Sequence, residues 1–400
     1  MSLTSKSPQD VAREALAAGT AALALYSHKF SPKKFTQPQL LACLVLKKFY
    51  KTDYRGISVM LAEHSDLRTI LGLERVPHFT TLQKASVRLL GLAGFRKVLR
   101  ATLRRVLGRR KIIPHAACDS SGLACGHASR YYVKRRAKGQ DKSEKPAQKT
   151  TYARYAKLEA IIDVSNHMCL GAIARRGPTP DIDRLVPLLK ETLKYVRLEL
   201  LAADAGFDSE PNHFYARQRC GIRTLMPAKH GRKTSKPPTG YWRRRMRHAL
   251  STKCRRRRTG YSQRSQVETV FSMIKRRQGE SVAARTTENQ SHELRLMIIT
   301  HNVMICLLAW VFYRAIMSPF PRLFRPRLER LPRLQLENHP RRPPPNQRPR
   351  RHRNPLPQKP VLKVVNKFIL GLLWRWIPIE CPIDPGRNIS SNILKPRKVN

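Results

Sequence analysis

The series of apolar segments between about residues 112 and 226 most limits how this chain can fold. Three short segments of strand length come first. After them, two amphipathic segments alternate with two further short ones. In chain order the seven segments are IIPHAACDSS, LEAIIDV, HMCLGAIA, PDIDRLVPLLKETLKYV, LELLAAD, SEPNHFYARQRC and GIRTLMPA. This order of strands and helices predicts an α/β domain with a mixed sheet.

The regions on either side differ in composition. Apolar residues at helical spacing, as in FTQPQLLACLVLKKFY, predict an all-α region before residue 112. Its short helices with basic faces are compatible with a helix-turn-helix module, although ordinary helical bundles are also common. Sixteen of the 29 prolines lie beyond Ser318, so a disordered tail is expected there. We therefore expect an N-terminal arm (1–35), a helical DNA-binding region (36–112), the α/β domain (113–317) with a basic loop (229–260), and a Pro/Arg-rich tail (318–400).

Charge indicates the kind of partner. The chain carries 79 Lys and Arg against 26 Asp and Glu, a formal net charge of +53. Such an excess attracts polyanions, because each neutralised phosphate of a nucleic acid releases condensed counterions. DNA or RNA is the expected partner, and an anionic membrane surface is the weaker alternative.

The segment 229–260 concentrates this charge and predicts a mobile loop that faces phosphates. Tyr241 and Trp242 lie within it, and they either stack on a splayed base or anchor the loop to the domain. The candidate DNA contacts in this segment are Arg243, Arg244, Arg245, Arg255 and Arg256.

The sequence predicts neither a membrane span nor a secreted protein. Leu296 to Tyr313 is apolar, but it contains His301 and Asn302 and follows a charged helix, so a buried core helix is expected. The eight cysteines are scattered and the first residues lack an apolar signal core, which favours reduced thiols in the cytoplasm. Cys118, Cys125 and His127 lack a second ligand pair, so structural zinc is not expected.

Three separated carboxylates are the strongest candidates for chemistry. Asp119 in AACDSSGL and Asp204 in LLAADAGFDS each end a predicted strand, and Glu268 lies on a predicted helix. Clustered carboxylates repel one another without a cation, whereas together they suit two divalent ions that act on a phosphodiester. Asp163 and Asp208 are the alternatives for the same roles.

The helix around Glu268 gives independent support. Tyr261, Arg264, Glu268 and Lys275 are spaced so that they fall within about 60° of one another around a helix. An apolar face lies beside them, formed by Val267, Val270, Phe271 and Ile274. An ordinary amphipathic helix with a solvated charged face is the alternative, but the two strand-end aspartates favour a site.

With these motifs, the chain resembles bacterial insertion-sequence transposases of the DDE type. Tyr261-x2-Arg264-x3-Glu268-x6-Lys275 fits the Y-R-E-K pattern of one subgroup, and DSSGL and ADAGFDS are similar to its two aspartate blocks. The likeness covers about residues 36–312. It implies a ribonuclease-H-like catalytic domain in which Asp119, Asp204 and Glu268 hold two Mg²⁺ ions, with Mn²⁺ as a substitute. It also implies that Arg264 and Lys275 contact phosphates near the cleaved end and that Tyr261 positions the strand.

The resemblance further implies an activity. Family members bind the terminal inverted repeats of their element, cut there, and use the freed 3′-hydroxyl to attack target DNA, as homodimers or higher multimers in the bacterial nucleoid. Only 63 residues separate Asp204 from Glu268, without the large β-rich insertion that members using a DNA hairpin often carry, so a hairpin route is not implied. A non-catalytic nucleic-acid-binding protein, a transposase relic, and a simple nuclease on the same fold are the alternatives.

Overall fold

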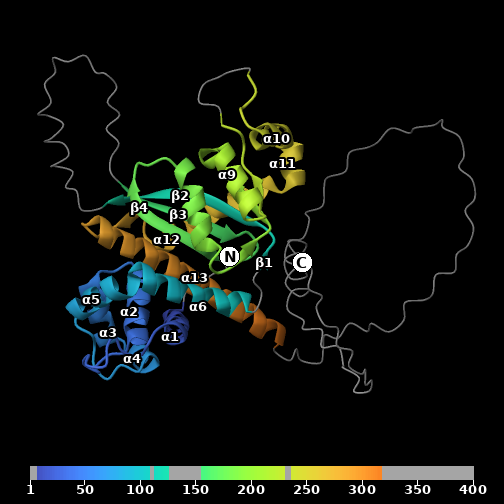
Figure 1. Ribbon diagram of the computed structural model, residues 1–400. Coiled ribbons are helices and arrows are strands. Elements are labelled where there is room, and N and C mark those ends of the chain that lie inside the picture. Colours follow the sequence, from blue (N-terminus) through green and yellow to red (C-terminus); the bar gives the residue numbers. More distant parts are fainter. Residues whose placement is uncertain (1–6, 109–111, 126–154, 230–235, 318–400) are drawn as a thin grey trace, which may run out of the picture. The chain divides into compact units, whose positions relative to one another are not determined.

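The computed structural model describes residues 7–108, 112–125, 155–229 and 236–317 (Figure 1), with side chains described as far as residue 307. The expected disordered tail, 318–400, lies outside the described residues. Residues 1–325 group into one compact unit by their contacts. The expected helical region and the expected α/β domain both lie within this unit.

Six helices form the N-terminal part of the described chain: α1 (Pro8–Ala22), α2 (Gln37–Phe49), α3 (Tyr54–Glu63), α4 (Ser65–Leu71), α5 (Phe79–Leu90) and α6 (Leu92–Leu107). Capping residues in the local sequence determine where several of these helices begin. Thr36 and Gln39 form a reciprocal capping box at α2, and the Asp53 side chain caps α3. The all-α prediction is confirmed. Part of the expected N-terminal arm is, however, helix α1, which packs against α2 and α6 and buries Val11 and Ala15.

The central sheet is mixed, as predicted. Its strands run in the order β4-β3-β2-β6-β7: β4 (Cys169–Gly177), β3 (Tyr155–Asp163), β2 (Ala116–Cys125), β6 (Leu200–Ala203) and β7 (Arg223–Leu225). The first three are antiparallel, whereas β6 is parallel to both β2 and β7. Helix α8 (Leu185–Thr192) connects β4 to the strands before β6, and α9 (Glu210–Phe214) with a following π turn connects β6 to β7. This order agrees with the expected ribonuclease-H-like arrangement.

Short pairings complete the strands. β1 (Ile112–Ile113) pairs with β5 (Arg197–Leu198), and β8 (Ser281–Val282) pairs with the far end of β2. All of these pairings are parallel. The first pair forms a separate two-stranded sheet, and the second fastens the segment after α12 to the central strand β2.

Helix α13 (Thr287–Met317) joins the two halves of the unit. It contacts α1, α2, α5 and α6 as well as β3 and β4. The Asn302 amide accepts from the Cys169 N–H and donates to its carbonyl, both at 3.0 Å, and also donates to the Thr102 hydroxyl at 3.3 Å. The apolar segment is thus a core helix, as predicted. None of the described helices is long and apolar enough to span a membrane.

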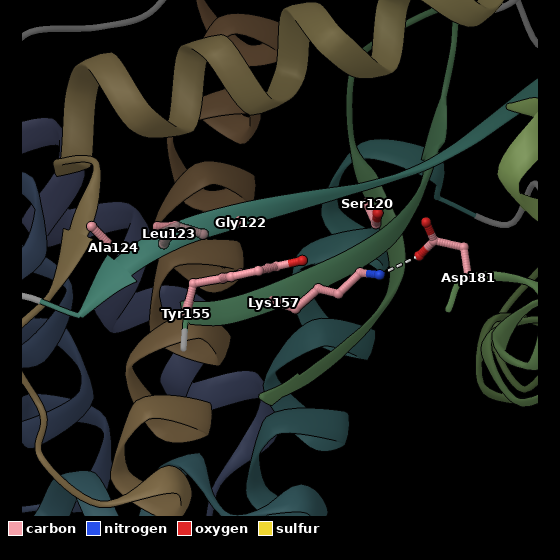
Figure 2. Close-up of a pocket in the computed structure, with 7 residues that line it drawn as sticks. All are labelled: Ser120, Gly122, Leu123, Ala124, Tyr155, Lys157 and Asp181. Atoms are coloured by element: carbon pink, nitrogen blue, oxygen red, sulfur yellow. Dashed lines mark ion pairs between the residues drawn. The ribbon is translucent and has the colours of Figure 1, made fainter. Parts of the chain in front are cut away.

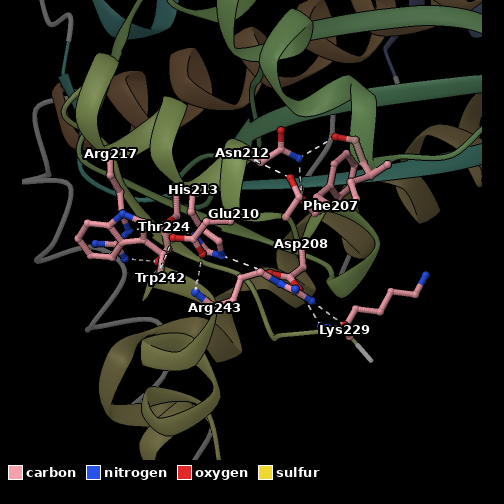
Figure 3. A network of polar contacts seen from close by, with 12 residues as sticks. Phe207, Asp208, Glu210, Asn212, His213, Arg217, Thr224, Lys229, Trp242 and Arg243 are labelled. Atoms are coloured by element: carbon pink, nitrogen blue, oxygen red, sulfur yellow. Dashed lines mark hydrogen bonds and ion pairs between the residues drawn. The ribbon is translucent and has the colours of Figure 1, made fainter. Parts of the chain in front are cut away.

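The expected mobile loop, 229–260, is largely helical where it is described, which corrects that prediction. It contains α10 (Tyr241–Ala249) and α11 (Lys253–Thr259), and η4 (Tyr261–Arg264) and α12 (Ser265–Gln278) follow. An acidic partner from another element is the reason. The Glu210 carboxylate accepts from the backbone N–H groups of Trp242 at 3.0 Å and Arg243 at 3.1 Å, at the start of α10 (Figure 3).

Candidate active site

Two adjacent parallel strands place the two candidate aspartates. β2 and β6 pair through Ala116 with Leu201, Ala117 with Ala202, and Cys118 with Ala203. Asp119 is the next residue on β2 and Asp204 directly follows β6, so they lie at equivalent positions where this pairing ends. The prediction of a strand end is wrong for Asp119, because β2 continues to Cys125 through its pairing with β3. Neighbouring strands lie about 4.8 Å apart, which brings the two carboxylates onto the same edge of the sheet.

Glu268 reaches this edge from the first turn of α12, which packs against β2. Arg264 connects the groups. Its Nη1 donates to Asp119 Oδ2 at 3.1 Å, and its Nη2 donates to Glu268 Oε1. A single guanidinium therefore links the first and third candidate carboxylates, although 149 positions separate them in the sequence.

The electrostatics reflect this crowding. Burial raises the pKa of Asp119, and the Asp204 and Glu268 carboxylates raise it further, against the opposing effects of the Ser120 N–H and Arg264. Burial also raises the pKa of Tyr261, and here again Asp204 contributes. The three carboxylates and Tyr261 therefore interact electrostatically.

The residue types fit divalent ions, but their present arrangement holds a guanidinium. Carboxylate oxygens are the preferred ligands of hard cations such as Mg²⁺, and their mutual repulsion at Asp119 calls for a cation. Within the described residues, no three Asp, Glu, His or Cys side chains are grouped so that they could hold one ion. Arg264 supplies the positive charge between Asp119 and Glu268 instead.

Tyr261 and Lys275 differ in their surroundings. Tyr261 is only 9% exposed and packs in a small apolar cluster with Leu200, Ala202, Leu225, Met246 and Leu250. Packing is therefore at least part of its role, and its sequence spacing gave no sign of this. Lys275 lies half-buried nearly two turns beyond Glu268, with no ion pair to any described residue. Near the C-terminal end of α12, Lys51 Nζ donates to the Arg276 carbonyl at 2.8 Å.

The candidate DNA contacts on α10 and α11 also differ in their surroundings. Arg243 is committed within the protein, because its Nε donates to Asp208 at 2.8 Å and its Nη2 donates to the Lys229 carbonyl at 2.8 Å (Figure 3). Arg244 and Arg245 instead line an open hollow of about 440 Å³ together with Gly240 and Tyr241. Arg255 and Arg256 donate to the carbonyls of His248 and Leu250, at the turn between the two helices.

The two aromatic residues of this segment have different positions. The Arg217 guanidinium lies over the Trp242 ring, 4.3 Å from its centre, and Trp242 therefore anchors α10 to the domain. Tyr241 is 62% exposed. Of the two alternatives weighed from the sequence, anchoring describes Trp242. The exposed Tyr241 ring lies edge-on to Trp242, with the ring centres 4.8 Å apart, and its hydroxyl accepts from Arg245 at 3.1 Å.

The alternative aspartates are occupied by structural contacts. Asp163 Oδ1 accepts from the N–H and hydroxyl of Ser165, which closes the turn after β3. Asp208 is buried beside His213, whose Nε2 lies 3.3 Å away, and contacts with His213, the Lys229 N–H and Arg243 lower its pKa against the effect of burial. Both carboxylates thus have partners away from Asp119.

A second hollow of about 440 Å³ lies beside β2 and was not anticipated (Figure 2). Ser120, Gly122 and Tyr155 line it, and Lys157 forms a 2.6 Å ion pair with Asp181 there. Tyr155 crosses Gly122 and Gly177 so closely that a Cβ would come within 2.9 Å and 2.4 Å of its ring. Glycine at these two positions therefore allows the ring to lie against the sheet. Their strand sequences alone gave no such signal.

Comparison with known families identifies this region. Residues 111–303 match the model of the transposase DDE domain. The matched segment contains the sheet, Asp119, Asp204, Glu268, Arg264 and Lys275. This part of the chain belongs to the DDE-type transposase family, as its motifs indicated. The Y-R-E-K subgroup stays a prediction. A comparison with curated proteins found no match.

Proposed function

We propose that this transposase binds the terminal inverted repeats of its element, cleaves DNA strands there and joins the 3′ ends to target DNA. The observation that carries the proposal is the convergence of Asp119, Asp204 and Glu268 at one sheet edge within a DDE domain. DNA is the substrate that a transposase implies, and the charge of +53 supports it.

In the proposal, Asp119, Asp204 and Glu268 hold two divalent ions, with Mg²⁺ expected and Mn²⁺ as a substitute. DDE transposases generally use divalent metal ions. When bound, such ions supply an activated oxygen nucleophile and neutralise charge at the phosphate. The sheet keeps Asp119 and Asp204 rigid, whereas Glu268, with its side chain 56% exposed, adjusts from the helix.

Two displacements at phosphorus make up the reaction. In the first, a water oxygen forms a bond to the phosphorus at the element end and the bond to the 3′ oxygen breaks. In the second, the freed 3′-hydroxyl bonds to a target phosphorus and displaces that strand's own 3′ oxygen. Arg264 and Lys275 contact the phosphates on either side of the reacting bond, and Tyr261 holds the turn that positions Arg264.

The remaining DNA path follows the basic surfaces. Arg244, Arg245, Arg255 and Arg256 contact the backbone from α10 and α11, and Arg243 holds α10 in place for them. Exposed basic residues on α5 and α6 extend the contact to the N-terminal region; they include Lys84, Arg88, Lys97 and Arg104. Two copies acting on paired ends in the nucleoid complete the proposal.

The carboxylates provide the decisive test. We expect Asp119→Asn, Asp204→Asn and Glu268→Gln each to reduce Mg²⁺-dependent cleavage of end-containing DNA by at least about a thousandfold, because each removes one ligand charge. DNA binding, measured by mobility shift in metal-free buffer with EDTA, should stay within about threefold. Short inverted repeats in the DNA flanking the reading frame supply the substrate sequence.

The exposed Glu280→Gln is the matched control, since it removes one carboxylate charge shortly after α12. Its cleavage rate should equal that of the unaltered protein. If all three site variants cleave at that rate, the active site lies elsewhere. If the unaltered protein binds ends but never cleaves them, the non-catalytic alternative is correct.

A further inference from the structure

Arg264 occupies the position between two of the proposed metal ligands. Its two terminal nitrogens donate to Asp119 Oδ2 and Glu268 Oε1, and the arginine and Asp119 side chains are each 19% exposed. The guanidinium therefore takes one oxygen of each carboxylate. Its partners come from two elements that the fold brings together, a sheet strand and the catalytic helix.

A guanidinium and a divalent ion compete for these two carboxylates. Arg264 already takes one oxygen of each, and two like charges within about 4 Å repel by several kcal/mol at the effective dielectric near a protein surface. A metal ion therefore enters only if Arg264 gives up its bonds to Asp119 and Glu268. A planar, bidentate donor that leaves a carboxylate binds well to a phosphate.

We propose that Arg264 is an exchangeable counterion, bound to the carboxylates in free protein and transferred to a DNA phosphate when metal enters. This inference rests on the proposed function of Asp119, Asp204 and Glu268. Its consequence is that DNA and metal bind cooperatively. DNA removes the competitor from the metal site, and metal releases the guanidinium for the DNA.

The coupling is reciprocal, because linkage requires each ligand to change the affinity of the other by the same factor. Saturating duplex DNA should raise the affinity of the full-length protein for Mn²⁺ by about 5- to 150-fold, the usual range of such couplings. Free Mn²⁺ is counted by electron paramagnetic resonance, with and without a 30-base-pair duplex of the element end. The readout is binding and does not require cleavage.

Arg264→Gln tests the exchange directly. In DNA-free protein it should bind Mn²⁺ about tenfold more tightly than the unaltered chain, and added DNA should then change that affinity less than about threefold. Arg276→Gln is the matched control: it removes the same charge from an exposed position near the end of α12, where the side chain donates to the Ser272 hydroxyl. It should alter the DNA-free affinity less than about twofold.

Arg264→Lys separates charge from geometry, since lysine keeps the charge but cannot span both carboxylates, and an intermediate affinity is expected. Far-ultraviolet circular dichroism confirms that each variant is folded. Equal or weaker Mn²⁺ binding by folded Arg264→Gln overturns the exchange. Asp204→Asn distinguishes that result from failure of the proposed site. If Asp204→Asn still binds Mn²⁺ as tightly as the unaltered protein, the ion does not bind at the proposed carboxylates.

Discussion

At the scale of residues, Asp119 shows how the candidate site lowers the stability of the fold. Its Oδ1 accepts from the Ser120 N–H at 2.8 Å, and Oδ2 accepts from Arg264. Burial and two neighbouring carboxylates nevertheless leave its pKa raised, so the ionised form is disfavoured where it stands. The fold therefore keeps a charge at this position at some expense of stability, as groups at functional sites often require.

His301 gives a prediction for pH. Complete burial lowers its pKa to about 4, whereas in the unfolded chain an imidazole titrates near 6.5. Between these values the unfolded state binds more protons, so the free energy of unfolding should fall as the pH drops from about 6.5 towards 4, by up to about 1.4 kcal/mol per unit. His301→Gln keeps an N–H donor for the His167 carbonyl, 2.9 Å away, but does not titrate, and should flatten this decrease.

Urea unfolding at a series of pH values measures that slope. The exposed His248→Gln is the control. A slope in His301→Gln as steep as in the unaltered protein would show that other groups cause the acid sensitivity.

Sequence reasoning reached the acidic residues of the candidate site but not their partners. Asp119 and Asp204 were recognisable because each ends an apolar run, although β2 continues beyond Asp119 to Cys125 and only Asp204 directly follows the end of its strand. The contact between Arg264 and Asp119 joins residues 145 positions apart, and no local pattern encodes it. The packing of Tyr261 against Met246 depends in the same way on where the basic helices lie.

At the scale of elements, α10 depends on a cap from another part of the chain. Glu210 Oε2 would lie 2.2 Å from a Cβ at position 240, where Gly240 has φ +96°. Only glycine therefore lets the carboxylate reach the first N–H groups of the helix. The cap orients Trp242 inward and leaves Arg244 and Arg245 on the open side.

Removing this cap should loosen α10 selectively. We expect Glu210→Ala to cost about 1 kcal/mol, the usual value for a lost N-terminal cap, and so to speed amide exchange at Trp242 and Arg243 about fivefold. Hydrogen exchange resolved by residue measures the effect, with exchange in β2 and β3 unchanged. Glu199→Ala, an exposed carboxylate before β6, is the control. Unchanged exchange in α10 would mean that Asp208 and Arg217 hold the helix without Glu210.

The elements between 112 and 226 were predictable because strand and helix periods differ clearly there. The basic segment was not, because its arginines resemble those of a solvated loop and the groups that hold α10 lie some thirty residues earlier, in α9 and the turn before it. The prediction of helix from local sequence fails where the stabilising partner is distant.

At the scale of the whole unit, an ion pair connects the helical region to the α/β domain. Lys48 on α2 lies 2.7 Å from Glu293 on α13, with side chains 6% and 12% exposed. Glu293 also accepts from the N–H groups of Ala283 and Ala284. Burial favours a raised pKa for Glu293, yet Lys48, Lys47 and the Ala284 N–H leave it lowered, so the pair is charged.

Lys48→Met should therefore destabilise the unit by about 3–5 kcal/mol, because it leaves a buried carboxylate without its cation. Glu293→Gln in the same chain should recover much of this, since a neutral amide still accepts from the backbone. Urea unfolding of the single and double variants measures the coupling. Lys84→Met, exposed on α5, should cost less than about 0.5 kcal/mol. Additive effects of the two site substitutions would show that the pair contributes nothing specific.

Helix α13 has one flank against the sheet and another against α1, α2, α5 and α6. A replacement set of N-terminal helices would have to fit the side chains on that second side of α13, because otherwise the helix that packs against β3 and β4 would lose part of its support. Changes in the N-terminal helices and in the α/β half must therefore be compatible with the same α13. Exchanging the N-terminal helices between related transposases should accordingly yield proteins that do not fold.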